Sequence, residues 1–284
     1  MTALLTSLAS AAFYGAADFL GGLASRRANT IAIVVISQLA GLIVLGLMLP
    51  FLPASSPAPS DWIWGAAAGV AGGIGVALLY RALAMGSMAL VAPITAVCAV
   101  TVPVATAIAF GERPGAGAVA GIALAIVAIV LVSQNDLESD GPASDQARAW
   151  SIATALASGV AIGLFFLTLA QTSPDAGMWP LVVARGVSFG LFATLALVMR
   201  RSMRMSTGVA ATAVAGGVLD MLANLLYLVA TRHGPLSIVV TLSSLYPAST
   251  VLLARTVLGE RLNAKQTAGI VCALVAVALI VGTR

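Results

Sequence analysis

Apolar segments of about twenty residues follow one another along almost the whole chain, and a helix needs about that length to cross a bilayer. Only 8% of the 284 residues are charged, whereas a soluble protein carries about 25% charged residues. So few charges cannot cover a surface that faces water. We therefore predict an all-α membrane protein with ten transmembrane helices. The expected segments are 3–24, 30–50, 61–83, 87–110, 115–133, 149–170, 178–199, 207–230, 236–257 and 264–282.

The two halves of the chain share short motifs at one constant offset. Leu8-Ala9-Ser10 recurs as Leu156-Ala157-Ser158, and Gly111-Glu112-Arg113 recurs as Gly259-Glu260-Arg261. Both pairs are 148 residues apart. In the third and eighth segments the similarity continues in a shifted register. A constant offset from the first segment to the last indicates a duplicated unit.

Each copy of this unit holds five segments, which is an odd number. The second copy must therefore cross the membrane upside down relative to the first. Inverted repeats of this kind are typical of secondary transporters, whose substrate site lies near the midplane where the copies meet. We expect repeat 1 at 1–133, an acidic linker at 134–148 and repeat 2 at 149–284, arranged around a central cavity.

Basic residues are unevenly divided between the two sides of the predicted bundle. Because basic loops stay in the cytoplasm, this division predicts that both termini lie outside and that the linker lies in the cytoplasm. We expect a bacterial inner-membrane protein, with both termini in the periplasm. Only Arg113, Arg232 and Arg284 lie on the opposite side. The loops after odd-numbered segments hold Arg26, Arg27, Arg148, Arg200, Arg201, Arg204, Arg261 and Lys265.

Signatures of metal, cofactor, enzyme and nucleic-acid chemistry are absent from the sequence. His233 is the single histidine, and Cys98 and Cys272 lie within apolar segments. The HExxH, GxSxG and P-loop motifs do not occur. The basic residues are scattered rather than gathered into a stripe, which argues against nucleic-acid binding. We expect no metal, no cofactor and no enzymatic activity.

Three ionisable residues stand out inside the predicted spans, where a charge is costly and is therefore a functional hypothesis by default. Arg185 and Asp220 lie within roughly 5 Å of each other in depth at a rise of 1.5 Å per residue, so they either bind substrate or neutralise each other as a structural pair. Asp18 has no obvious partner. Burial favours the protonated form of a carboxyl, which suits proton coupling, although Asp18 could equally be a helix-packing residue.

Polar side chains follow one face of the first and eighth segments. Asp220, Asn224 and Tyr227 share a face of the eighth segment, and Tyr14 and Asp18 share a face of the first. A polar face on a membrane helix must contact protein or water rather than lipid. These faces predict a wet central cavity. Tyr80 matches Tyr227 in the other copy, and each tyrosine has the alternative of being an ordinary core residue.

Prolines interrupt the fourth segment at Pro93 and Pro103 and the ninth at Pro247. A proline inside a helix removes a backbone hydrogen bond and bends the helix. Thr95 and Ser244 lie close enough to bond the freed carbonyls. We expect the three prolines to act as gates, with a static kink as the alternative. The predicted substrate-binding residues are Tyr14, Asp18, Tyr80, Thr95, Arg185, Asp220, Asn224, Tyr227 and Ser244.

Two stretches carry a family resemblance, YRALAMGSMALVAPITAVCAVTVPVATAIAFGER and YLVATRHGPLSIVVTLSSLYPASTVLLARTVLGER. The chain resembles the EamA-type drug/metabolite transporters over nearly its whole length, and among them the aromatic amino-acid exporters. The resemblance implies a basket-like fold with a cavity lined by helices 1, 3, 4, 6, 8 and 9. One departure is that Thr241 stands at the counterpart of Pro93, so the two gates need not behave alike. We interpret Glu112 and Glu260 as structural residues at helix ends.

The leading hypothesis is a secondary transporter that exports amino acids or similar small metabolites by alternating access. Its partners are a small-molecule substrate and the lipid bilayer. The first alternative is an exchanger or exporter of sugars, nucleotide-sugars or drugs. Anionic substrates would require more than one arginine in the cavity, and Arg185 is the only central candidate. A membrane scaffold without transport is the alternative from another class.

Overall fold

The computed structural model describes residues 1–52, 55–110, 115–133, 142–233, 239, 242–243 and 245–282. Within these residues all regular structure is helical. Two short 3-10 helices, η1 (Leu49–Phe51) and η2 (Pro174–Ala176), lie in connections. The α-helices are α1 (Thr2–Ser25), α2 (Thr30–Met48), α3 (Pro59–Met85), α4 (Met88–Ala109), α5 (Ala116–Ser133), α6 (Pro142–Leu169), α7 (Trp179–Val198), α8 (Thr207–His233), α10 (Tyr246–Val257) and α11 (Ala264–Gly282).

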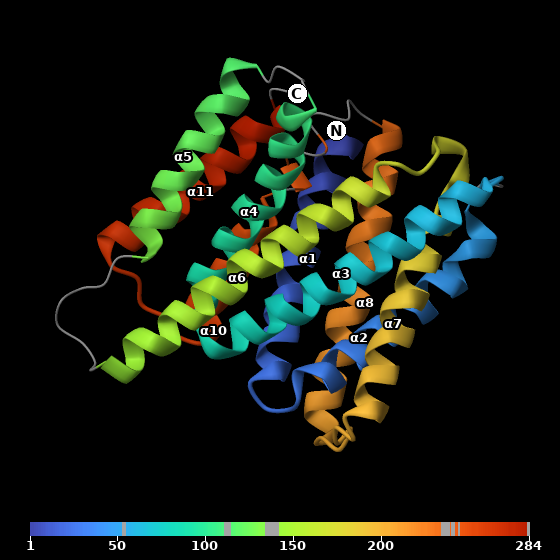
Figure 1. Cartoon of the computed structure of the whole chain (residues 1–284), viewed down its shortest axis with the longest axis horizontal. Helices are drawn as coiled ribbons and strands as arrows, with labels where there is room; N and C mark the ends of the chain where they lie inside the picture. Colours follow the sequence, from blue (N-terminus) through green and yellow to red (C-terminus); the bar gives the residue numbers. More distant parts are fainter. Residues whose placement is uncertain are drawn as a thin grey trace.

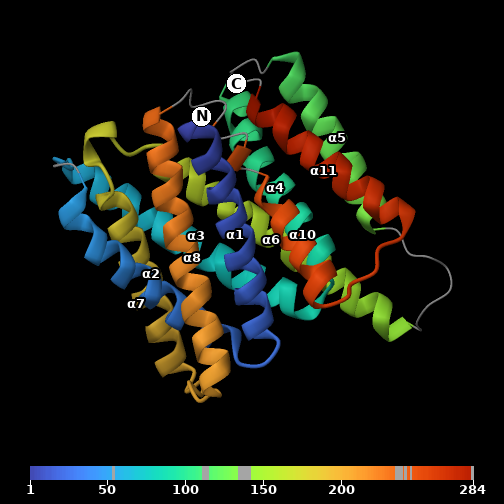
Figure 2. The same ribbon diagram turned by 180° about the vertical axis from the view of Figure 1, so that it is seen from behind.

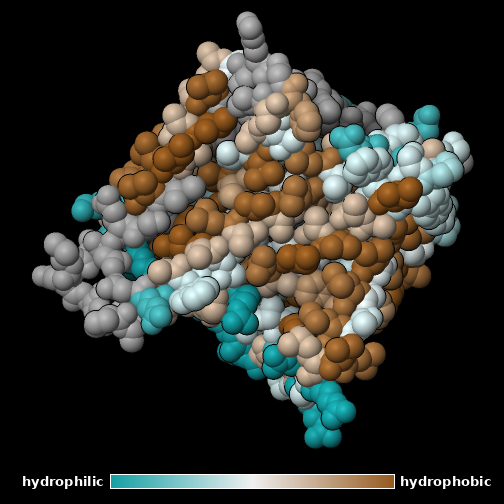
Figure 3. Space-filling view, viewed as in Figure 1, coloured by the Kyte–Doolittle hydropathy of each residue, from teal (hydrophilic) through white to brown (hydrophobic). Residues whose placement is uncertain are grey.

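The outer surface of the bundle is apolar. Ile63 is 70% exposed and Leu197 is 78% exposed, which would be unfavourable in water and is expected in lipid. Brown, hydrophobic side chains cover the middle of the face in Figure 3, and teal, hydrophilic ones gather toward its ends. Six described helices are long and apolar enough to cross a membrane, namely α1, α2, α3, α6, α7 and α8. The chain is therefore a multi-pass membrane protein.

The helices of the two halves pack against each other throughout the bundle. The most extensive contacts join α1 to α8 and α3 to α6. α2 packs against α7 and α8, and α3 also packs against α7. α5 and α11 lie side by side at the edge of the bundle next to α4, as both Figure 1 and Figure 2 show. The centre is thus formed by helices from both halves, and the α5–α11 pair lies outside it.

Two hydrogen bonds hold the α1–α8 and α3–α6 contacts in the same way. The Ser10 hydroxyl donates to the carbonyl of Ala223 at 2.9 Å, and the Ser158 hydroxyl donates to the carbonyl of Gly75 at 2.8 Å. The two donor residues are 148 residues apart in the sequence, and so are the two acceptor residues. The contact residues of the third and eighth segments are therefore related by the same offset of 148 residues as the other motifs. The similar sequence motifs within these two segments are related by a slightly different offset. Both acceptor residues, Ala223 and Gly75, are small, and small residues let membrane helices approach each other closely.

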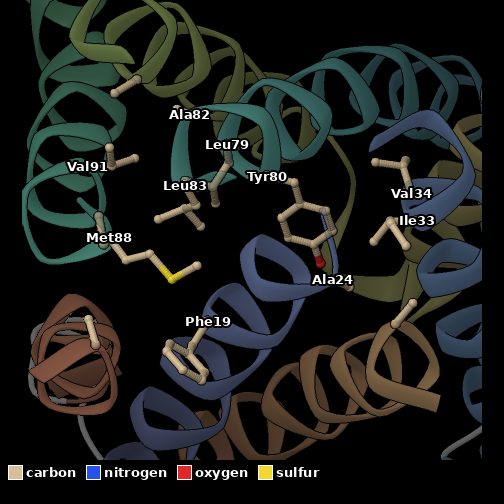
Figure 4. Packing of buried hydrophobic residues seen from close by; sticks show 14 of the residues in the cluster. Phe19, Ala24, Ile33, Val34, Leu79, Tyr80, Ala82, Leu83, Met88 and Val91 are labelled. Atoms are coloured by element: carbon tan, nitrogen blue, oxygen red, sulfur yellow. The ribbon is translucent and has the colours of Figure 1, made fainter. Parts of the chain in front are cut away.

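A buried apolar cluster lies where α1, α2, α3 and α4 meet. Phe19, Leu83 and Met88 are almost fully buried in it. The Tyr80 ring points from α3 toward α1 in Figure 4 and lies directly against Gly21, where a Cβ atom would overlap the ring. The ring therefore fills space that only a glycine leaves open.

Helix boundaries differ from the prediction at two places. α6 begins at Pro142 rather than 149, so the second part of the expected linker is helical, with proline in the first turn where its missing N–H costs nothing. The ninth segment, expected as one helix over 236–257, turns at Leu245 before α10 begins at Tyr246. Pro247 therefore lies in the first turn of a helix rather than inside one.

We expect Gly217→Ala to destabilise the protein, because a Cβ atom there would lie 2.8 Å from the carbonyl carbon of Ser37 on α2. Backbone cannot move aside cheaply, and overpacking of this kind costs about 1–3 kcal/mol. Gly190→Ala in α7 is the matched control, because a Cβ atom there meets nothing within 4 Å. Thermal unfolding in detergent should show a lower Tm for Gly217→Ala only. Equal Tm values would contradict close α2–α8 packing.

Candidate functional site

A cavity of about 580 Å³ lies among the central helices. This volume is within the range of small-molecule sites. None of its described lining comes from α5 or α11, whereas α2 and α7 contribute in addition to the helices that the family resemblance implied. Its polar and aromatic lining residues are Tyr14, Asp18, Gln38, Phe165, Phe166, Thr172, Arg185, Ser188, Asp220, Asn224, Tyr227, Ser243 and Tyr246.

Arg185 and Asp220 form an ion pair at the cavity wall. The guanidinium Nη2 donates to Asp220 Oδ2, and Nη1 donates to Gln38 Oε1 at 2.8 Å. The side chains of Arg185 and Asp220 are only 14% and 24% exposed, so each removes most of the cost of burying the other. The two residues neutralise each other and also face the cavity.

Asp18 lines the same cavity from α1. Within the part of the chain that the structure describes, no hydrogen bond or ion pair reaches its carboxyl group. Tyr14 lies one turn earlier on the same face of α1 and also lines the cavity. The structure thus brings Asp18 and the Arg185–Asp220 pair to one space and leaves Asp18 available to a ligand.

The polar faces of α8 and α1 differ in how much of each lines the cavity. On α8, Asn224 and Tyr227 both line the cavity, and the Asn224 amide donates to the carbonyl of Asp220 at 2.7 Å. On α1, only Tyr14 and Asp18 reach the cavity. Ser10, earlier on α1, is fully buried and donates to α8 instead. The first part of the α1 face therefore holds helices together.

Aromatic rings form much of the remaining wall. The Tyr14 and Tyr246 rings meet edge to face with centroids 6.2 Å apart, and the adjacent Phe165 and Phe166 rings have centroids 5.4 Å apart. Of these residues, only Tyr14 is in the predicted site. Adjacent phenylalanines on an apolar helix carry no signal of a site, because lipid-facing and cavity-facing phenylalanines look alike in sequence.

Gln38 also lines the cavity without being in the predicted site. Its amide oxygen accepts from Arg185, and the residue is almost fully buried. It is the only amide residue within the second apolar segment. A polar side chain at such a position must face protein, and this was the signal that could have identified it.

Two predicted site residues do not line the cavity. Tyr80 is buried in the cluster between α1, α2 and α3. Thr95 is fully buried, and its hydroxyl donates to the carbonyl of Ala155 at 3.2 Å, which joins α4 to α6. Ser244 lies outside the described residues. Tyr80 and Tyr227 match in sequence, yet one packs in a core and the other faces the cavity.

The predicted gating prolines also lie in different places. Pro93 is buried within α4. Pro103 lies further along the same helix and lines the cavity. Pro247 is buried in the first turn of α10. Of the three, only Pro103 is in direct contact with the cavity.

Glu260 fastens one end of the bundle, and we call its set of bonds the Glu260 contact. Its carboxylate accepts from the backbone N–H groups of Met88 and Ala89 at 3.0 Å and from the Ser87 hydroxyl at 2.7 Å. Arg26 Nη2 lies 3.3 Å away. A carboxylate at the N-terminus of α4 satisfies free N–H groups and the helix dipole. Glu260 is thus a structural residue at a helix end, as we interpreted it from sequence, and its counterpart Glu112 lies outside the described residues.

Asp61 fastens the other end in a similar way, and we call this set of bonds the Asp61 contact. Its carboxylate accepts from the Ser173 N–H at 2.7 Å, from the Ser173 hydroxyl at 2.8 Å and from the Ala58 N–H at 2.7 Å. The start of α3 is therefore bound to the connection between α6 and α7. The Trp62 and Trp179 rings, with centroids 5.7 Å apart, lie at the same end.

The cavity extends toward the Asp61 contact. Thr172, Gly177 and Met178, all in the connection between α6 and α7, belong to its lining. Its described lining includes no residue of the connections that meet at the Glu260 contact. The space between the centre and the Glu260 contact is instead filled by the apolar cluster around Leu83 and Met88.

The EamA-like transporter family model matches residues 1–134 and 149–282, which is most of the chain. The chain belongs to the EamA-like transporter family. No curated protein shows significant similarity to it. A solved structure, titled only as the crystal structure of a protein, is similar with a TM-score of 0.61 at 14% identity over 98% of this chain and 95% of that one. At that identity the similarity shows the fold alone.

Membership in the EamA-like family indicates a membrane transporter of small metabolites or drugs, and the family is generally not enzymatic. The cavity combines charged, amide and aromatic side chains inside an otherwise apolar bundle. Among the described residues, no group of three or more His, Cys, Asp or Glu side chains is placed to hold a metal ion.

We expect Asp220→Asn to lower the Tm strongly, because it leaves the Arg185 charge buried without its counter-ion at a cost of about 3–5 kcal/mol. The double variant Asp220→Asn with Arg185→Gln should recover much of this loss, since neither charge remains. Thermal unfolding of the purified proteins measures both effects. A double variant that is no more stable than Asp220→Asn would show that the pairing of these charges does not stabilise the bundle.

Proposed function

We propose that this EamA-like protein is a secondary transporter that exports amino acids or similar small metabolites by alternating access. The observation that carries the proposal is the central cavity, where Asp18 and the Arg185–Asp220 pair lie beside aromatic rings. Charged groups beside an apolar wall suit a substrate that has a polar end and an apolar body. The same hypothesis includes the resemblance of the sequence to aromatic amino-acid exporters within the family.

Alternating access in such a protein rests on two inverted copies of one unit. The equivalent bonds of Ser10 and Ser158 at an offset of 148 residues support this arrangement. So does the family match, whose two segments coincide with the proposed repeats. With ten spans and basic loops in the cytoplasm, both termini lie in the periplasm of a bacterial inner membrane, and the Glu260 contact lies on the cytoplasmic side.

The two end contacts are candidates for the gates of the transport cycle. Each joins one half of the chain to the other, Arg26 and α4 to Glu260 at one end and Asp61 to Ser173 at the opposite end. In an alternating-access cycle each contact would have to break once. Pro93 and Pro103 in α4 and the helix break before Pro247 would let the adjoining helices bend.

Anionic substrates such as nucleotide-sugars fit this cavity poorly. Arg185 is the only basic residue in the described lining, and Asp220 already neutralises it. The volume and the apolar wall remain compatible with drug-like molecules as an alternative cargo. A scaffold without transport would have no use for charged groups lining a central cavity.

Transport can be tested in proteoliposomes loaded with labelled amino acids. We expect the protein to support counterflow of at least one amino acid, faster under a pH gradient if Asp18 carries protons. Asp18→Asn should remove the effect of the gradient, so that any counterflow that remains is the same with and without the gradient. If no amino acid moves in a preparation that stays folded, the amino-acid hypothesis is wrong, and a screen of sugars and drugs would follow.

A cleavable thiol cross-linker should stop transport when it bridges either end contact. One variant carries Ser87→Cys and Glu260→Cys, and a second carries Asp61→Cys and Ser173→Cys, both with the native Cys98 and Cys272 replaced by alanine. We expect cross-linking to abolish counterflow in both variants and reduction to restore it. Each single-cysteine parent is the control. Full transport by either cross-linked protein would show that this end does not open.

A further inference from the structure

Three charged side chains are present in the described lining of the cavity, and two of them cancel. Arg185 and Asp220 form their ion pair, so their charges sum to zero. Asp18 is the third, and nothing in the described part of the chain bonds to it. With Asp18 ionised, the empty cavity carries one negative charge in a region of low polarity.

We propose that the cavity selects organic amines and that Asp18 binds their ammonium group. The inference rests on the proposed function and names the chemistry of its substrate. An unpaired carboxylate inside a membrane is costly. A ligand with one positive charge cancels this charge and supplies the hydrogen bonds that the carboxylate lacks.

The surroundings of Asp18 suit an ammonium group on an apolar body. Tyr14 lies one helical turn from Asp18 on the same face of α1, and its ring meets that of Tyr246 at 6.2 Å. The faces of such rings attract cations. The Phe165 and Phe166 rings on α6 provide an apolar wall for the rest of the molecule.

The same geometry disfavours a ligand carboxylate. Arg185 is the only basic residue in the described lining. Its Nη1 is bound to Gln38 and its Nη2 to Asp220. An incoming carboxylate would have to compete with Asp220 for this guanidinium, and success would leave Asp220 as a second unpaired charge. The expected order of affinity is therefore amine, then zwitterion, then acid.

Three compounds that share the indole ring test this order, because their side chains carry different charged groups. Tryptamine is a cation, tryptophan a zwitterion and indoleacetate an anion. Isothermal titration calorimetry on the full-length protein in detergent should show tryptamine binding about tenfold tighter than tryptophan, because the tryptophan carboxylate can reach Arg185 only by displacing a charge-assisted hydrogen bond from Asp220. Indoleacetate should not bind measurably. Equal affinities for tryptamine and tryptophan would overturn the inference, and so would the absence of tryptamine binding.

Asp18→Asn should weaken tryptamine binding by about tenfold, because it removes one charge-assisted hydrogen bond to the ammonium group, and it should leave the binding of uncharged indole unchanged. Asp175→Asn is the matched control, because Asp175 is exposed and lies outside the cavity lining. It should bind tryptamine as the unmodified protein does. Loss of tryptamine and indole binding together in Asp18→Asn would indicate a collapsed cavity, and unchanged tryptamine affinity would overturn the role of Asp18.

Failure of this inference can be told apart from failure of the proposed function. Counterflow of tryptophan without binding of tryptamine would leave the amino-acid transporter intact and refute the amine preference. Binding and counterflow of tryptamine in the absence of any amino-acid counterflow would support the amine preference and refute amino acids as the cargo. Failure of every indole compound to bind or move would refute the amine preference, and counterflow of other amino acids would then decide the proposed function separately.

Discussion

The arrangement of this protein depends on the requirement that a buried charge has a partner, since lipid supplies none. The Arg185–Asp220 pair meets the requirement at the centre, and Glu260 and Asp61 meet it at the two ends. Glu260 and Asp61 connect elements that are far apart in the sequence, and Asp220 joins the neighbouring helices α7 and α8. The charged residues inside and near the membrane therefore determine which helices stay together. Among the charged residues of the described cavity lining, Asp18 is the exception, and for that reason it is the one most open to a ligand.

The bundle separates packing from binding along single helices. On α1, the Ser10 hydroxyl bonds to α8, and one to two turns later Tyr14 and Asp18 face the cavity. α8 does the same, with Gly217 against α2 and Asn224 beside the cavity. Each helix is thus held by one part of its length and presents side chains with another. Because packing and cavity-lining residues occupy different parts of each helix, the helix contacts can stay closely packed around the cavity.

The fold was more predictable from the sequence than the site was. Apolar length and scarce charge indicate spanning helices, and charged residues such as Asp18 and Asp220 identify a cavity, because both signals follow directly from the cost of polar groups in lipid. Tyr80 illustrates the limit, since a ring that fills the space beside Gly21 looks in sequence like one that faces a cavity. The limit applies equally to Phe165, which lines the cavity without any polar signal. Which apolar neighbour a ring meets depends on packing between distant helices.

The hydroxyls of Ser10 and Ser158 both donate to backbone carbonyls, so neither bond requires a particular side chain on the partner helix. The acceptor residue is alanine in one half of the chain and glycine in the other, and the bond is the same. Such contacts keep one geometry in both halves while the side chains around them differ. The first half supplies Asp18 to the cavity, and the second half supplies Arg185 and Asp220. Backbone contacts that match between the halves can in this way enclose a cavity whose lining does not match.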